Sequence, residues 1–162
     1  MFNLPAVGIK AASNYIGNAR NGDSKFHVDN ILFPPNPNHV SDDAKLTFEQ
    51  MTRNEGLEFE EFTVITEDGY YLQVFHMFVP GLKPGSPVVF FQHGLFSSAD
   101  TWIAHKDKSP AFRAAKAGYD VWLGNNRGTE HSRKHTKYSA TKNYKEYFDY
   151  SFFELGKYDA PA

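Results

Sequence analysis

The stretch that decides the fold is Val88-Val89-Phe90-Phe91-Gln92-His93-Gly94-Leu95. Its first four residues form an unalternating apolar run after Pro87, which is typical of a strand buried on both faces, as in a parallel sheet. A loop over 92–98 follows, and then a helix is predicted over about 110–116 and a second buried strand over 119–123. A strand, a helix and a strand in this order indicate an α/β fold with parallel strands.

The residues before this stretch predict a helix and a hairpin. Apolar residues at helical spacing predict a helix over about 42–55, with Ser41 as its N-cap and Gly56 as its stop. Two β-rich segments follow, over 59–66 and 70–79. We expect Glu67-Asp68-Gly69 to join them as a tight turn, because glycine adopts the positive φ that such turns need.

The two ends of the chain differ from this middle part. Residues 1–40 have no sustained helical or strand period and include Phe33-Pro34-Pro35-Asn36-Pro37, so we expect an extended N-terminal arm. Residues 41–162 form the second predicted unit. Its last segment, 144–158, is rich in aromatic residues and is expected to pack on the sheet as a helical or part-helical stretch.

Composition excludes several classes of protein. The formal net charge of -2 offers no field for gathering nucleic acid, and no apolar run approaches a membrane span. Cysteine is absent, which excludes disulfides and cysteine-based metal or redox sites. Asn-x-Ser/Thr sites are also absent, so we expect an intracellular rather than a secreted location. The acid-poor residues 1–22 leave a mitochondrial or membrane-associated location open.

Several separated blocks carry a family resemblance. Phe91-Gln92-His93-Gly94-Leu95 is similar to the third strand and oxyanion loop of acid lipases, the gastric and lysosomal type of α/β-hydrolase. The resemblance continues through Ala117-Gly118-Tyr119-Asp120-Val121-Trp122-Leu123-Gly124-Asn125 to Lys157-Tyr158-Asp159-Ala160-Pro161-Ala162, and it covers about residues 40–162. It implies an incomplete α/β-hydrolase fold, with the first four strands and their flanking helices.

The resemblance also implies a role for the loop His93-Gly94-Leu95. Acyl transfer builds negative charge on a carbonyl oxygen, and backbone N–H groups aimed at that oxygen lower the barrier. In such hydrolases one donor comes from the loop after the third strand and the other from the residue after the nucleophile. The Leu95 amide is therefore the expected first donor, while Gly94 allows close approach and His93 holds the loop.

The rest of the catalytic machinery is not in this sequence. The family needs a Gly-x-Ser-x-Gly elbow followed by an acid and a histidine, and no Gly-x-Ser-x-Gly occurs here. The chain also reads Thr129-Glu130-His131 where the family usually has Asn-Thr-Trp. We therefore expect a non-catalytic structural subunit, completed by partner chains in a larger assembly. The alternative is the N-terminal part of an active lipid ester hydrolase whose nucleophile, acid and histidine lie on another segment.

The strand order of the family, 1-2-4-3-5-6-7-8, makes a prediction about partners. With only four strands present, Val88, Val89, Phe90 and Phe91 would lie at an open edge. A hydrophobic open edge aggregates unless another element covers it. Other protein chains are therefore the expected partners, with lipid or membrane contact as a further option and nucleic acid excluded.

Other residue patterns point to no cofactor and no metal. His131 and His135 have helical ligand spacing, but their segment is a polar loop without a third ligand. The basic residues around them could touch lipid phosphates, although a solvated surface is the simpler interpretation. Residues 124–128 lack the pattern of a nucleotide-binding loop. Arg127 is interpreted as a structural ion-pair residue, and Trp102 and Trp122 as core or loop anchors.

Overall fold

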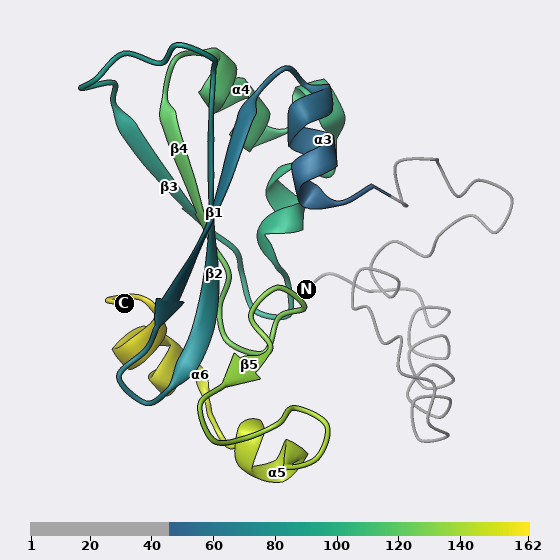
Figure 1. The fold of residues 1–162 in the computed structure, drawn as a ribbon, viewed down its shortest axis with the longest axis vertical. Coiled ribbons are helices and arrows are strands. Elements are labelled where there is room, and N and C mark those ends of the chain that lie inside the picture. Colours follow the sequence, from purple (N-terminus) through teal and green to yellow (C-terminus); the bar gives the residue numbers. More distant parts are fainter. Residues whose placement is uncertain (1–45) are drawn as a thin grey trace, which may run out of the picture. The chain divides into compact units, whose positions relative to one another are not determined.

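The computed structural model describes residues 46–162. The predicted N-terminal arm, the Ser41 cap and the first residues of the predicted helix over 42–55 lie outside the described residues. Within them, a mixed sheet carries helices against it (Figure 1). Its strands are β1 (Glu58–Ile65), β2 (Tyr70–Phe78), β3 (Val88–Gln92), β4 (Asp120–Gly124) and the short β5 (Lys134–His135).

The strand order is β1-β2-β4-β3, with β5 paired to β2. β2 pairs antiparallel with β1 and with β4, and β3 pairs parallel with β4. The order expected from the resemblance is therefore confirmed, and β3 lies at the edge of the sheet. The two-residue strand β5 was not predicted, because so short a segment has no detectable period.

The β1–β2 hairpin forms as predicted. Gly69 adopts a φ of +101°, and a Cβ there would lie 2.4 Å from Thr136 Oγ1. The Thr66 hydroxyl oxygen accepts a hydrogen bond from the Tyr70 N–H at 2.9 Å and closes the turn. Glycine is thus needed at this position both for its conformation and for space.

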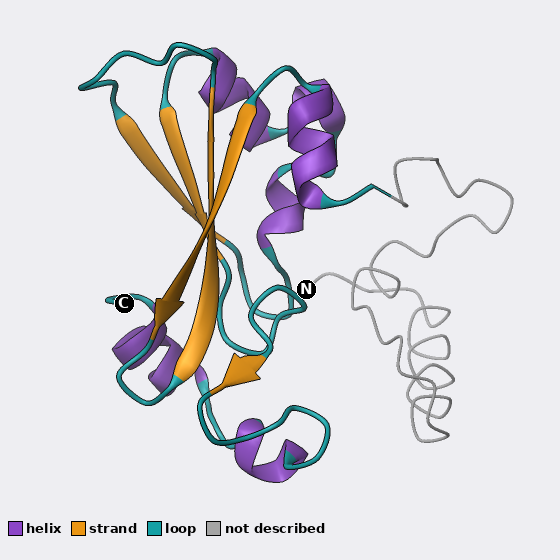
Figure 2. Cartoon of the chain, in the orientation of Figure 1, coloured by secondary structure: helices purple, strands orange, loops and turns teal. Residues whose placement is uncertain are grey.

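Helices lie on the sheet at the predicted places (Figure 2). Helix α3 (Phe48–Asn54) is capped by Thr47 and Gln50, which form a reciprocal capping box, and Gly56 follows it with a φ of +76°. Helix α4 (Pro110–Lys116) begins with proline, as helices often do. Two 3-10 turns, η2 (Ala99–Trp102) and η3 (Lys106–Lys108), precede it.

The aromatic C-terminal segment is part-helical, as predicted. It consists of α5 (Tyr144–Tyr147), α6 (Phe152–Glu154) and a π-helical turn, η4 (Leu155–Asp159). Among the described residues no helix is long and apolar enough to cross a membrane.

Two separate cores form on opposite faces of β2. Phe75 and Met77 belong to the main core with α3 and α4, whereas Tyr70 and Leu72 pack with Tyr147 in a second, smaller core. Because side chains alternate along a strand, these odd-numbered and even-numbered residues lie on opposite faces. β2 therefore buries one face at its start and the other at its end.

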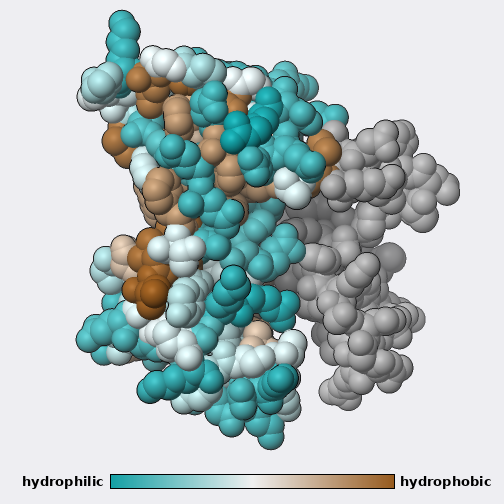
Figure 3. Space-filling view, in the orientation of Figure 1, coloured by the Kyte–Doolittle hydropathy of each residue, from teal (hydrophilic) through white to brown (hydrophobic). Residues whose placement is uncertain are grey.

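The prediction that 88–91 is buried on both faces is wrong. Val89 and Phe91 pack against the main core, but residues Val88 and Phe90 are 66% and 57% exposed. No described helix covers their face of the strand, and hydrophobic surface is visible over this side of the molecule (Figure 3). The apolar run therefore predicts the strand correctly but not the exposure of one of its faces.

Candidate functional site

His93 follows β3 directly and ties two loops together. Its Nε2 accepts a hydrogen bond from the Asn126 N–H at 3.0 Å, and its Nδ1 lies 2.8 Å from the Gly94 carbonyl oxygen. Because Nε2 is an acceptor, the ring proton belongs on Nδ1, which donates to Gly94. Burial lowers the pKa of His93, which favours this neutral ring. His93 thus fixes the start of the loop after β3 to the loop after β4.

A tight turn over 94–97 presents Leu95 to solvent. The Ser97 N–H donates to the Gly94 carbonyl oxygen at 3.3 Å, and Phe96 adopts a φ of +62°, which is unusual outside glycine. The Leu95 side chain is 70% exposed, and its N–H donates to no other group in residues 46–162. The turn therefore leaves one backbone donor open at the carboxyl end of β3.

Asn125 holds the far end of the same loop. Its Oδ1 accepts a hydrogen bond from the Ala99 N–H at 2.9 Å, and its Nδ2 donates to the Gln73 carbonyl oxygen at 3.1 Å. The Ser132 hydroxyl donates to the Asn125 carbonyl oxygen at 2.9 Å. Asn125 was not singled out from the sequence. The sequence signal for its role is that Asn125 is a polar residue directly after a strand predicted to be buried.

The ion pairs of Arg127 confirm that it is a structural residue. Its guanidinium forms a fork with Asp68, at 2.6 and 2.9 Å, and its Nε donates to Asp159 at 2.7 Å. The guanidinium carbon lies 4.0 Å from the centre of the Tyr70 ring. Burial acts against the charged form of Asp68, but the hydrogen bonds from Arg127 and Thr66 outweigh it and lower its pKa. Arg127 therefore joins the hairpin turn to the C-terminal segment.

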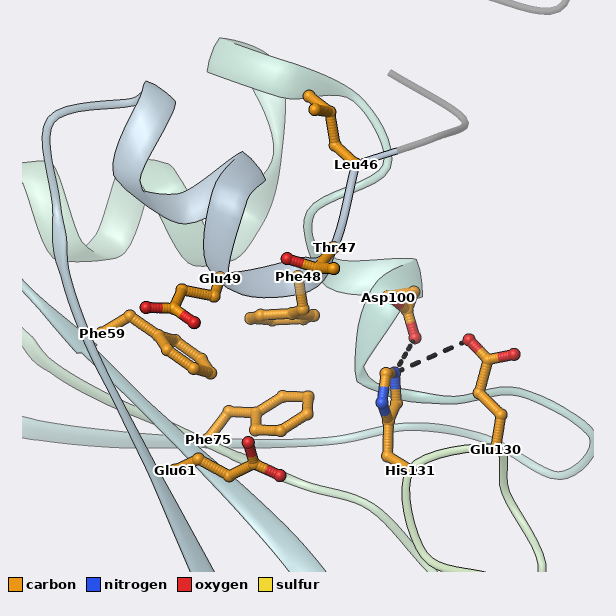
Figure 4. Close-up of a pocket in the computed structure, with 10 residues that line it drawn as sticks. All are labelled: Leu46, Thr47, Phe48, Glu49, Phe59, Glu61, Phe75, Asp100, Glu130 and His131. Atoms are coloured by element: carbon orange, nitrogen blue, oxygen red, sulfur yellow. Dashed lines mark hydrogen bonds and ion pairs between the residues drawn. The ribbon is translucent and has the colours of Figure 1, made fainter. Parts of the chain in front are cut away.

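His131 lies beside a hollow with an aromatic wall and an acidic rim (Figure 4). Its Nε2 is 2.6 Å from Asp100 Oδ2 and 3.8 Å from Glu130 Oε1. Burial disfavours the imidazolium, but the hydrogen bond and charge of Asp100 outweigh it and raise the pKa of His131. The hollow has a volume of about 430 Å³ and is also lined by Phe48, Phe59 and Phe75, among others.

The structure does not bring His131 and His135 to one ligand position. His135 Nε2 donates to the Asp68 carbonyl oxygen at 3.1 Å, and its Nδ1 accepts from the N–H groups of Lys137 and Tyr138. His131 instead faces Asp100. The segment is a loop with a two-residue strand, as its polar sequence predicted, so the spacing of four residues does not bring the two rings together.

The two tryptophans act as packing residues. Trp102 contacts Phe91 with ring centres 5.0 Å apart and lies against the main core. Trp122 stacks on His76 at 4.1 Å on the opposite face of the sheet. Both therefore serve as anchors, as the sequence indicated.

His93, Gly94 and Leu95 are the residues of the predicted oxyanion loop, and the structure places them together directly after β3. The Leu95 N–H is open, and the hydrogen bonds of His93 hold the loop that presents it. A complete site also needs a nucleophile and a second donor from the residue that follows it, and the sequence holds no Gly-x-Ser-x-Gly. The oxyanion role of these three residues stays a prediction.

Comparison with known proteins gives consistent matches. Residues 48–106 match the family model described as the partial α/β-hydrolase lipase region. Rat gastric triacylglycerol lipase is 44% identical over 138 residues, covering 81% of this chain and 33% of that protein. Human lipase member K is 41% identical, covering 77% of this chain and 32% of that protein. Human gastric triacylglycerol lipase is 43% identical, covering 75% of this chain and 31% of that protein.

A solved structure gives a weaker match. Brefeldin A esterase, described as a bacterial homologue of human hormone sensitive lipase, is 16% identical with a TM-score of 0.39, covering 82% of this chain and 31% of that one. The family assignment rests on the lipases, which are far more similar in sequence.

None of their names supports a mitochondrial location, and an intracellular one is compatible with them. The chain spans about a third of the length of these lipases. The chain corresponds in sequence to the N-terminal portion of the acid lipases, which are α/β-hydrolases.

Proposed function

We propose that this chain supplies the scaffold and the oxyanion loop of a lipid ester hydrolase. The nucleophile, acid and catalytic histidine would lie on a segment that this sequence does not include. The observation that carries the proposal is the open Leu95 N–H at the carboxyl end of β3, presented by a loop that His93 fastens at its start. Relatives named as triacylglycerol lipases support the class of substrate.

In this proposal the chain's own residues prepare the site before substrate arrives. The ester carbonyl oxygen becomes negatively charged when a nucleophile attacks, and the Leu95 N–H donates a hydrogen bond to it. Because His93 and Asn125 already fasten the loop at both ends, little reorganisation is needed at that moment. Arg127 keeps the segment around Asp159 against the same end of the sheet. By resemblance, that segment leads toward the nucleophile.

We also propose that further protein covers the exposed side and edge of β3. The exposure of Val88 and Phe90 supports this proposal, because apolar side chains on an unpaired edge strand promote aggregation. The cover could come from a continuation of the same polypeptide or from another chain. The expectation of a non-catalytic subunit has no support from the relatives, all three of which are named lipases.

Removal of the Leu95 N–H tests the proposed function. Leu95 is the second residue of the turn over 94–97, a position that accepts proline. Leu95→Pro should therefore remove the donor and keep the turn, while Leu95→Ala removes only side-chain contacts. In the native protein that contains this chain, Leu95→Pro should lower kcat for a medium-chain ester by roughly 10²–10³-fold.

The control variant Leu95→Ala should keep most of the activity. Equal kcat values for the two variants would contradict the role of the N–H. A native protein that neither hydrolyses lipid esters nor reacts with a fluorophosphonate probe would contradict the proposed function as a whole. The intact mass of that protein identifies the source of the missing segment, since a single chain would be much heavier than 18.4 kDa.

A further inference from the structure

Three side chains of metal-binding type converge at the mouth of the hollow described above. Asp100 comes from η2, and Glu130 and His131 come from the loop after β4. One ligand atom from each of them lies within 4.8 Å of the other two. Figure 4 shows the imidazole of His131 pointing toward both carboxylates.

We propose that Asp100, Glu130 and His131 bind a zinc ion. In a tetrahedral site with bonds of about 2.0–2.1 Å, neighbouring ligand atoms lie roughly 3.3 Å apart. The two distances from His131 Nε2, 2.6 Å to Asp100 and 3.8 Å to Glu130, lie on either side of this value. For these two pairs, zinc would therefore move Asp100 away from His131 and Glu130 toward it, each by well under the length of a bond.

The surrounding residues contact Asp100 and His131, and Glu130 lies on the exposed side of the cluster. The Ser98 hydroxyl donates to Asp100 Oδ2 at 2.5 Å. The Phe75 ring meets the His131 ring edge-on at 4.9 Å, and Phe48 does so at 6.3 Å. The Glu130 side chain is 52% exposed, so its rotation displaces no core residue. The small shift that zinc requires is thus available on the exposed side of the cluster.

The donor set favours zinc over calcium and magnesium. One imidazole nitrogen with two carboxylates suits zinc, whereas Ca²⁺ and Mg²⁺ prefer oxygen ligands throughout. The hollow of about 430 Å³ leaves room for water at the fourth position. Three protein ligands and one water are the pattern of zinc sites that keep an exchangeable position.

The site would be a feature of this chain and not of the acid lipases in general. Glu130 and His131 belong to the block in which this sequence departs from the usual family pattern Asn-Thr-Trp. The ion would join the loop after β3 to the loop after β4, parallel to the hydrogen bond between His93 and Asn126. Its effect would be to stabilise this pair of loops, whether or not the protein hydrolyses esters.

Titration calorimetry with zinc chloride tests the site. It uses the full chain, together with whatever segment or partner keeps it soluble. We expect saturable binding of one ion per chain and a rise of Tm in zinc. Glu130→Gln and Asp100→Asn should each weaken the Kd at least tenfold. Glu61→Gln is the matched control, because Glu61 lines the same hollow outside the cluster; its charge acts on His131 through space, so its removal should weaken the Kd far less than removal of a ligand.

Three outcomes would overturn the proposal. The first is the absence of saturable binding to the wild-type chain. The second is a Kd for Glu130→Gln equal to that of wild type, since zinc would then bind at other histidines. The third is an equal loss in Glu61→Gln, which would indicate attraction by general negative charge. Circular dichroism of each variant checks that it is folded. If Asp100→Asn does not fold, Glu130→Gln still tests the site.

Discussion

Replacement of Arg127 by methionine should be among the most damaging single changes outside the apolar core. The side chains of Arg127 and Asp159 are each only 1% exposed, while that of Asp68 is 27% exposed. Methionine fills a similar volume but leaves the Asp159 carboxylate buried without its partner. Loss of one member of a buried pair costs about 3–5 kcal/mol, and most of that cost should come from Asp159 because water still reaches Asp68.

Urea unfolding followed by circular dichroism measures this loss. Lys116→Met is the matched control, because it removes an ion pair with Glu55 from a site where the lysine side chain is 42% exposed. Exposed pairs contribute about 0–1 kcal/mol, so the two variants should differ several-fold. Arg127→Lys should lie between them, since lysine keeps the charge but cannot form the planar fork.

A double variant separates the buried charge from other effects. Asp159→Asn keeps a side-chain oxygen that can accept the hydrogen bond from the Arg127 N–H, observed at 2.9 Å. When it is combined with Arg127→Met, the free energy of unfolding should recover part of the loss, because the only carboxylate left without Arg127 is that of Asp68, which water reaches. A loss no greater than that of Lys116→Met, or a double variant less stable than Arg127→Met alone, would refute this reasoning.

Three further predictions concern other parts of the fold. The pKa of His93 is lowered in the folded chain, so the unfolded chain binds more protons at pH values between that pKa and about 6.5. The contribution of His93 to stability should therefore grow as pH rises through this range and be lost below the folded-state pKa. The difference in free energy of unfolding between wild type and His93→Gln, measured in urea across this range, tests this, and a difference that does not change with pH would contradict it. Gly69→Ala and Gly81→Ala both place alanine at positive φ, at a cost of roughly 1–2 kcal/mol. Gly69→Ala should cost more, because its Cβ would meet the Thr136 side chain whereas Gly81 borders open space. Equal losses of stability in thermal unfolding would count against the close contact with Thr136. Phe90→Ser should reduce aggregation of the isolated chain in light scattering, because it removes an exposed aromatic side chain from the edge strand; unchanged aggregation would place the cause elsewhere.

Most of the secondary structure could be predicted from the sequence because its signals are local. Pro110 and Gly118 bound helix α4 at the predicted place, and Gly69 marks the hairpin turn. The strand order followed from the family resemblance and from nothing in the apolar pattern itself. The same pattern overstated the burial of Val88 and Phe90, because it records how apolar a strand is and not what covers it.

The candidate site was predictable only in part. His93, Gly94 and Leu95 stand together in the sequence, so their loop could be located from the residues alone. The partner of His93 could not, since Asn126 lies 33 residues away and is brought close only by the parallel pairing of β3 with β4. For the same reason, the sequence suggests His135, four residues away, as the neighbour of His131, whereas the fold brings His131 to Asp100, 31 residues away.

The sequence by itself determined most of the helices and strands, the turn at Gly69 and the position of the loop after β3, because period, breakers and short motifs act over a few residues. Only the tertiary structure decided which charges meet. Arg127 joins Asp68, 59 residues before it, to Asp159, 32 residues after it, and His131 turns toward Asp100. Such pairs depend on which strands are neighbours and where their loops emerge. Sheet order and register fix both, and no local pattern encodes them.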